Sequence, residues 1–252
     1  MASESSTSSR SDNGRKRHRM VDRVAAILEL AARNPDGLTL TELARNLEAP
    51  VSSIQGLVNG LVATGYLDER ERRYHLGTAP YLLNLIAGRH MVTRVAHDQL
   101  EAVHAETGLT TLLSVVVGRD VFYIDSCASE PRYDYLAKNY IRRALIRTSS
   151  GWVLLAGLSR RDLWAYLSAL PSEDEPKVER FLARLDEIQE TGVCAAPGIS
   201  DVADGVAVAV REGGRTVAAV SVVGPPDEIR DRRDDLVKVL LDHQARWDSP
   251  AG

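Results

Sequence analysis

The feature that most restricts this chain is an uncharged segment at residues 51–64. Its large apolar residues recur with the spacing of one helix face, at Ile54, Leu57, Val58, Leu61 and Val62. Because residues at i, i+3, i+4, i+7 and i+8 share one side of a helix, we expect these side chains to be buried. The other side carries only small or uncharged residues, namely Ser52, Ser53, Gln55, Gly56, Asn59 and Gly60. Such a face fits the major groove, where amides and hydroxyls read base edges, so the segment predicts a DNA-recognition helix.

Two helices are predicted before this segment. The first begins near Val21 and ends at the breaker sequence Asn-Pro-Asp-Gly over residues 34–37. The second is shorter and carries apolar residues between positions 40 and 47. Thr39 and Glu42 have the spacing of a capping box at its start, while Thr41 is a rival N-cap and a candidate DNA contact. Three helices in this order predict a helix-turn-helix.

A short hairpin is predicted directly after the third helix. Gly65 is a good stop residue, and the apolar residues at 66–67 and 74–76 flank a polar turn. The arginines Arg70, Arg72 and Arg73 are expected at the tip of this wing, where they could reach phosphate oxygens. A plain solvated turn is the alternative, because three acidic residues lie among the arginines.

Charge is distributed unevenly along the chain. The whole protein has a formal net charge of -4, whereas six basic and only two acidic residues lie between positions 10 and 23. Residues 1–19 are predicted to be a disordered basic tail, since their Ser-rich start lacks an apolar pattern. This tail is either a solvated leader or an arm that contacts phosphates or a minor groove. An acidic protein with one basic end is compatible with a specific DNA reader.

Other classes of protein find little support in the residues. No apolar run approaches the roughly 20 residues that span a bilayer, and the N-terminus lacks a secretory pattern, which predicts a cytoplasmic protein with no membrane partner. The two cysteines, Cys127 and Cys194, lack metal-ligand spacing and predict neither a disulfide scaffold nor a metal site. No nucleophile elbow or phosphate-binding glycine loop is present, so we expect no catalytic residues and no cofactor.

The remainder of the chain has a different pattern. A linker helix with an apolar stripe is predicted at residues 79–92. Two β-hairpins follow, whose strands are expected at 110–117 with 121–126 and at 206–210 with 216–223. Helices are expected at residues 93–107, 150–158, 160–170, 178–191 and 227–247. Hairpins and helices without βαβ alternation predict an α+β domain built on an antiparallel sheet.

Several stretches of this sequence resemble the isocitrate-lyase-regulator (IclR) family of transcription factors. They are "VDRVAAILELAARNPDGLTLTELARNL", "APVSSIQGLVNGLVATGYL", "RRYHLG", "GWVLLAGLS" and "VAAVSVVGPPDEI". The resemblance implies a winged helix-turn-helix at residues 20–78, the linker helix at 79–92 and a GAF-like effector-binding domain at 93–252. It also implies a homodimer or a homotetramer that binds a double-stranded DNA operator.

The resemblance implies two sets of site residues. Ser52, Ser53, Gln55 and Asn59 would face DNA. A small effector, often an organic or aromatic acid, would occupy a pocket in the C-terminal domain. That pocket would draw on Ser149 and Ser150 at the start of a helix, on Ser221, and on the strand around Gly205.

The chain departs from the family pattern at several of these places. Gly56 stands where an arginine is usual, and Gly205 stands where cysteine is frequent. The usual His and Lys before the helix appear as Ile146 and Trp152, and Cys-Ala-Ala-Pro over residues 194–197 replaces an acidic cluster. The sequence therefore defines the fold better than it defines the effector.

Each candidate effector residue also has a structural interpretation. Ser149 and Ser150 could cap their helix rather than bind a carboxylate. The hydroxyl of Ser221 could bond to backbone rather than to ligand. Arg147 could pair with an acidic ligand or with Asp201 or Asp204.

Two other functions compete with the regulator. One is a hydrolase-like enzyme with Ser149 or Cys194 as nucleophile, which would need a positioned base. The other is a winged helix used only for contacts with proteins.

Overall fold

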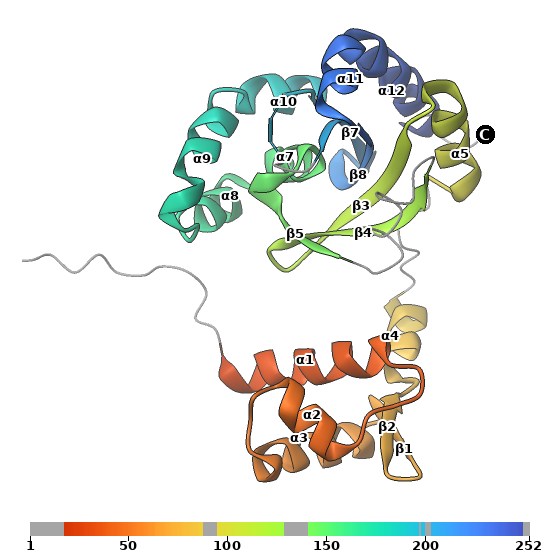
Figure 1. Ribbon diagram of the computed structural model, residues 1–252, viewed down its shortest axis with the longest axis vertical. Helices are drawn as coiled ribbons and strands as arrows, with labels where there is room; N and C mark the ends of the chain where they lie inside the picture. Colours follow the sequence, from red (N-terminus) through yellow and green to blue (C-terminus); the bar gives the residue numbers. More distant parts are fainter. Residues whose placement is uncertain (1–17, 88–94, 129–140, 197, 200–202, 249–252) are drawn as a thin grey trace, which may run out of the picture. The chain divides into compact units, whose positions relative to one another are not determined.

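The computed structural model describes residues 18–87, 95–128, 141–196, 198–199 and 203–248. The chain divides into two compact units, residues 1–91 and 92–252, and each is described by itself (Figure 1). Nearly all of the predicted basic tail lies outside the described residues. Within the part that is described, no helix is both long and apolar enough to cross a bilayer.

The N-terminal unit contains three helices and a two-stranded hairpin in the predicted order. These elements are α1 (Arg19–Arg33), α2 (Leu40–Asn46), α3 (Val51–Ala63), β1 (Leu67–Arg70) and β2 (Arg73–Leu76). The strands are antiparallel, with Leu67 opposite Leu76, and an isolated bridge between Leu38 and Tyr74 ties the hairpin to the segment before α2. This arrangement is a winged helix-turn-helix, which confirms the predicted fold class for this part of the chain.

The apolar side of α3 forms the centre of this unit. Ile54 and Val58 have no exposed surface, and they pack with Ile27 of α1 and Leu43 of α2. Leu57 and Val62, which were expected to be buried as well, are half-buried at the margin of the face. Burial of a helix along one apolar stripe fixes its rotation, because turning the helix would expose these side chains. The polar side of α3 is therefore held outward.

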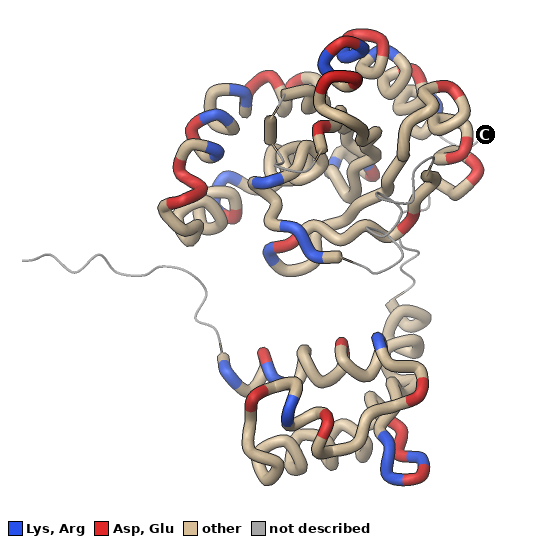
Figure 2. The backbone as a smooth tube through the Cα atoms, in the orientation of Figure 1, with Lys and Arg blue, Asp and Glu red and all other residues tan. Residues whose placement is uncertain are grey.

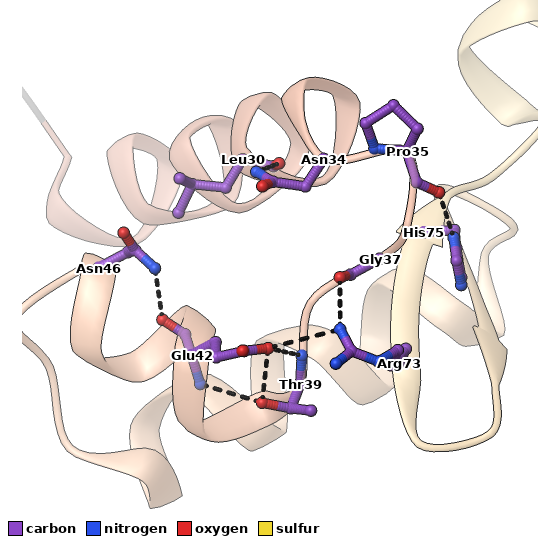
Figure 3. Close-up of polar contacts among 9 residues, drawn as sticks. All are labelled: Leu30, Asn34, Pro35, Gly37, Thr39, Glu42, Asn46, Arg73 and His75. Atoms are coloured by element: carbon purple, nitrogen blue, oxygen red, sulfur yellow. Dashed lines mark hydrogen bonds and ion pairs between the residues drawn. The ribbon is translucent and has the colours of Figure 1, made fainter.

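A capping box starts α2 (Figure 3). The backbone N–H of Glu42 donates to the Thr39 hydroxyl over 3.3 Å, and the N–H of Thr39 donates to the Glu42 carboxylate over 2.8 Å. These bonds satisfy amides that a helix start leaves unpaired. Thr39 is thus the N-cap, and the alternative assignment of this role to Thr41 is wrong.

The helix α4 (Ala79–Ala87) follows the wing and has no buried residue. It begins at the predicted position, and the rest of the predicted linker helix lies outside the described residues. Its large apolar residues are each at least 50% exposed, namely Tyr81, Leu82, Leu83, Leu85 and Ile86. In the described single chain this surface is left open.

The C-terminal unit is built on a six-stranded antiparallel sheet. Its strands are β3 (Thr110–Val117), β4 (Asp120–Cys127), β5 (Arg142–Ala144), β6 (Val193–Cys194), β7 (Asp204–Glu212) and β8 (Arg215–Gly224). Their order is β5-β4-β3-β8-β7-β6, so the two predicted hairpins lie side by side in the centre. The antiparallel α+β domain is confirmed. The short edge strands β5 and β6 were not predicted.

Helices cover both faces of this sheet (Figure 1). They are α5 (His97–Thr107), α7 (Ser149–Ala156), α8 (Arg160–Leu167), α9 (Glu175–Leu182), α10 (Leu185–Thr191), α11 (Pro226–Asp231) and α12 (Arg233–Asp248), with short 3-10 turns at Leu145–Arg147 and Ser172–Asp174. On one face, Trp152 of α7 packs edge-on against Phe181 of α9, with ring centroids 5.5 Å apart. On the other face, Leu100 of α5 and Leu240 of α12 lie in a separate apolar cluster.

Two predicted helices are each divided in two. The segment 178–191 turns between α9 and α10, and apolar residues keep helical spacing through the turn, so the sequence pattern did not show it. The segment 227–247 breaks at Arg232. This residue is held from outside its helix, because its guanidinium donates to the Thr107 carbonyl oxygen over 2.7 Å. A tertiary contact of this kind leaves no periodic signal.

Candidate functional site: a DNA-facing helix and a buried hydroxyl site

The outward side of α3 holds the four residues predicted to face DNA. Ser52, Ser53, Gln55 and Asn59 are all exposed. No side-chain hydrogen bond ties Gln55 or Asn59 to another described residue, so both amides are available to an external partner. The helix carries no charge along its length. What this surface offers is a row of neutral donors and acceptors, which is the chemistry that reads base edges.

Gly56 lies on the same exposed side of α3. A Cβ added at this position would meet nothing within 4 Å. The glycine is therefore not required by packing, and the position can accept a side chain. Next to it, a groove of about 440 Å³ runs between α3 and Val24 and Leu28 of α1.

The wing carries its charges at the turn (Figure 2). Glu71 and Arg72 form the turn with positive φ angles of 51° and 62°, the backbone form that hairpins of two residues require. Arg72 is exposed at the tip, while Arg70 pairs with Asp68 at 3.3 Å. Arg73 differs from the expectation, because its guanidinium turns back to donate to the Gly37 carbonyl oxygen over 2.9 Å (Figure 3).

In the C-terminal unit, α7 starts beside the central strands. Thr148 is its N-cap, since its hydroxyl accepts from the N–H of Gly151 at 2.9 Å. The interpretation of Ser149 and Ser150 as the cap is therefore wrong, and these two residues form the first turn. Both are buried. Their backbone N–H groups point along the helix axis beyond its start, where an anion is favoured.

Gly205 of β7 lies directly against this helix start. A Cβ built on Gly205 would be 3.1 Å from the Ser149 hydroxyl oxygen and 2.7 Å from the carbonyl oxygen of Val222. The close approach of α7 to the sheet therefore depends on the missing side chain. The structure thus brings together Gly205 and Ser149, two of the residues predicted for the effector site; their role in binding an effector stays a prediction.

Ser221 lies on β8, on the face of the sheet that α7 covers. It pairs with Leu112 on one side and Ala207 on the other, and both neighbours belong to the cluster packed under α7. The Ser221 hydroxyl is fully buried and has no hydrogen-bond partner among the described residues. The alternative of a backbone partner is therefore not realised within the described part of the chain.

The sequence analysis missed a second hydroxyl of this kind, that of Thr110. It is also buried without a partner within the described ranges. Thr110 starts β3 opposite Val223, next to the row that contains Ser221. The available signal was the alternation of β3, which puts Thr110 on the same face as Leu112. A threonine in a strand is common, however, and only the absence of a partner distinguishes this one.

Arg147 precedes α7 and is already paired. Its Nε donates to the buried Asp174 carboxylate over 2.8 Å, and its Nη2 contacts Glu173. The hydrogen bond to Asp174 raises the pKa of Arg147 the most, and the contact with Glu173 raises it further. The suggested pairing with Asp204 is wrong, because Asp204 accepts from the N–H of Gly198 over 2.7 Å, and Asp201 lies outside the described residues. Arg147 thus connects two turns rather than offering a free cation.

The cysteines do not present activated thiols. Burial raises the pKa of Cys194 to about 12, so this thiol is protonated at neutral pH. Burial also raises the pKa of Cys127. Among the described residues there is no group of His, Cys, Asp and Glu side chains that could hold a metal ion.

A three-helix unit with a wing, followed by a domain on a six-stranded antiparallel sheet, defines a two-domain regulator of the winged helix-turn-helix class. Residues 20–71 match the family model for the IclR helix-turn-helix domain, and residues 85–247 match that for the C-terminal domain of IclR bacterial transcriptional regulators. Because the two matches cover most of the chain, the protein belongs to the IclR family of bacterial transcriptional regulators.

Solved structures of this family share the fold. An IclR homologue from Microbacterium hydrocarbonoxydans, crystallised with 4-hydroxybenzoate, has a TM-score of 0.67 at 24% identity, with 91% of this chain and 97% of that one covered. An IclR-family regulator from Brucella abortus has a TM-score of 0.66 at 17% identity over 94% of each chain. One from Alicyclobacillus acidocaldarius has a TM-score of 0.58 at 20% identity, covering 93% of this chain and all (100%) of the other. No curated protein sequence matches significantly.

Proposed function

We propose that this protein binds a specific operator through α3 and the wing, and that a small organic or aromatic acid bound in its C-terminal domain alters this binding. One observation carries the first part: the exposed side of α3 is uncharged and presents the free amides of Gln55 and Asn59. Thr41, Ser52 and Ser53 complete the contacts, with Arg70 and Arg72 of the wing near phosphates. We assign residues 20–78 to DNA binding, 79–92 to the linker and 93–252 to the effector domain.

The test is a titration of labelled DNA from the promoter region of the gene against a scrambled duplex of equal length. We expect tighter binding to the promoter fragment and a steep loss of affinity as salt rises. Gln55→Ala and Asn59→Ala should each lower the preference about tenfold, because a good base contact discriminates by about 1–3 kcal/mol. Asn46→Ala is the control, since this amide of α2 bonds to the Glu42 carbonyl oxygen instead. Equal affinity for both duplexes would contradict a specific regulator.

The effector site is proposed at the start of α7. Three observations support this site: Ser149 and Ser150 start the helix, Gly205 lies against the Ser149 hydroxyl, and Ser221 is on the same face of the sheet, one row away on β8. A buried carboxylate needs donors such as the N–H groups of a helix start, because the nearby described arginine, Arg147, is already paired with Asp174. Because the structurally similar Microbacterium protein holds 4-hydroxybenzoate, aromatic acids are suitable first probes in a thermal-shift screen.

Self-association is proposed through α4. Operator half-sites on one face of a duplex lie about one turn apart, so a reader needs two copies. Ile86 is 73% exposed and Tyr81 is 67% exposed, which is unusual for large apolar side chains on one short helix. Ile86→Asp should shift the mass in light scattering toward the monomer, and Asn84→Asp adds the same charge as a control. An unchanged dimer or tetramer would place the interface elsewhere.

We further propose that the protein acts in the cytoplasm and has no enzymatic activity. The family consists of transcriptional regulators, and the thiol of Cys194 is held protonated by burial. Esterase turnover that disappears in Ser149→Ala would contradict this proposal.

A further inference from the structure

Two buried hydroxyls lie on one face of the central strands without partners in the described ranges. Ser221 is 1% exposed and Thr110 is 2% exposed. Other buried hydroxyls nearby are satisfied: Ser114 donates to the Ala219 carbonyl oxygen over 3.0 Å, and Thr111 donates to that of Leu109 over 3.4 Å. Since buried polar groups in proteins are nearly always paired, an unpaired couple on one face indicates an external partner.

The strand register places the two hydroxyls together. Thr110 is opposite Val223 and Leu112 is opposite Ser221, so Thr110 and Ser221 are diagonal neighbours on adjacent strands. Diagonal neighbours on one face lie about 7 Å apart and remain within reach of a shared contact. One ligand oxygen between them would satisfy both hydroxyls.

The same register fixes their position relative to α7. Val223 of β8 pairs with Thr110 of β3 on one side and with Gly205 of β7 on the other. Thr110 is therefore two strands away from Gly205, which lies against the Ser149 hydroxyl. Two strand spacings amount to about 10 Å. Val223 lies between Thr110 and Gly205 in the same row, and Ser221 is one row further along β8, diagonal to both. Thr110 and the helix start are thus at opposite ends of one row, on the face of the sheet that also carries Ser221.

The two ends differ in chemistry. Backbone N–H groups at a helix start favour an anion, whereas two hydroxyls can donate or accept and suit a neutral oxygen. The described cation closest in sequence to α7, Arg147, is engaged by Asp174 and Glu173. A second ligand carboxylate placed at Thr110 would therefore find no free Arg147 to balance its charge.

We propose that Thr110 and Ser221 bind an uncharged oxygen of the effector, and that the effector is an acid carrying a hydroxyl or carbonyl group at the end remote from its carboxylate. Thr110 is then a specificity-determining residue. This inference rests on the proposed acid effector at the start of α7, and it adds the second polar group and its distance from the first.

The experiment compares three acids by thermal shift and calorimetry on the full chain. In 4-hydroxybenzoate the hydroxyl is across the ring from the carboxylate, in 2-hydroxybenzoate it is adjacent, and benzoate has none. We expect 4-hydroxybenzoate to bind about tenfold more tightly than the other two, the magnitude of a hydrogen bond that would otherwise be lost in a buried site. Thr110→Val and Ser221→Ala should remove this difference.

Thr111→Val is the matched control, because Thr111 is on the opposite face and its hydroxyl is already bonded. It should keep the preference for 4-hydroxybenzoate. Thr110→Val should also leave the melting temperature of the free protein unchanged or raise it, which separates a ligand contact from a structural role. Equal binding of the three acids, or a preference that survives Thr110→Val, would overturn this inference and leave the acid effector standing. No stabilisation by any of the three would contradict both.

Discussion

The two threonines at the start of α2 allow a decisive substitution experiment. Thr39 caps the helix through the bond from the Glu42 N–H (Figure 3). Thr41, in contrast, is exposed on the first turn. Thr39→Ala removes the hydroxyl acceptor, and loss of an N-cap costs about 1 kcal/mol. That free energy corresponds to about a fivefold increase in the population of the opened helix. Thr41→Ala should leave the helix as stable or slightly more stable, since alanine has the higher helix propensity.

Hydrogen–deuterium exchange of peptides covering α2 measures this difference directly. Thr39→Ala should accelerate exchange about fivefold, and Thr39→Ser should restore the wild-type rate because it keeps the acceptor. Thr41→Ala should instead lower affinity for operator DNA about three- to tenfold, the net value of a lost hydrogen bond, without faster exchange. Equal exchange in Thr39→Ala and Thr41→Ala would refute the assignment of the cap and the division of roles between the two residues.

Three further perturbations test other features. Gly56→Arg adds a cation at a position where a side chain would contact no other atom. The slope of log binding constant against log salt concentration should therefore become steeper by about one, whereas Gly56→Ala, the control, should leave it unchanged. An unchanged slope in Gly56→Arg would place this position away from phosphates. The backbone N–H of Thr39, and then its hydroxyl, donate hydrogen bonds that lower the pKa of Glu42. The stability that these bonds give to α2 is therefore present above the ordinary pKa of 4.5 and should be lost as the pH falls through the lowered pKa. Amide-exchange protection factors of α2 that stay constant from pH 6 to pH 3 would contradict this. Iodoacetamide at pH 8 should modify Cys194 only after denaturant is added, because its pKa is about 12; rapid modification of the native protein would disprove its burial.

The helix-turn-helix was readable from the sequence because its signals are local. The capping spacing of Thr39 and Glu42, the breaker sequence at 34–37 and the one-sided apolar pattern of α3 each depend on residues within a few positions. The two central hairpins of the second unit were readable for the same reason. Their β-branched strands flank short turns, and both hairpins were found at nearly the observed positions.

The effector site was less readable because it depends on distant contacts. Arg147 is occupied by Asp174, which lies 27 residues away in the chain, and no pattern announces this pair. Thr110 is distinguished only by a hydroxyl that has no partner among the described residues and that lies beside Ser221, on a strand more than a hundred residues later. Sequence periodicity defines which face a residue occupies, but hydrogen-bond satisfaction is a property of the packed domain.

The absence of charge on α3 separates search from recognition. In the proposed mode of binding, the electrostatic attraction that lets a protein slide along any duplex comes from arginines of other elements such as the wing, and discrimination between base pairs comes from the neutral residues of α3. The two properties can therefore change independently during evolution. On this proposal, replacing Gln55 or Asn59 with another neutral residue would change the preferred operator and leave the affinity for other DNA unchanged.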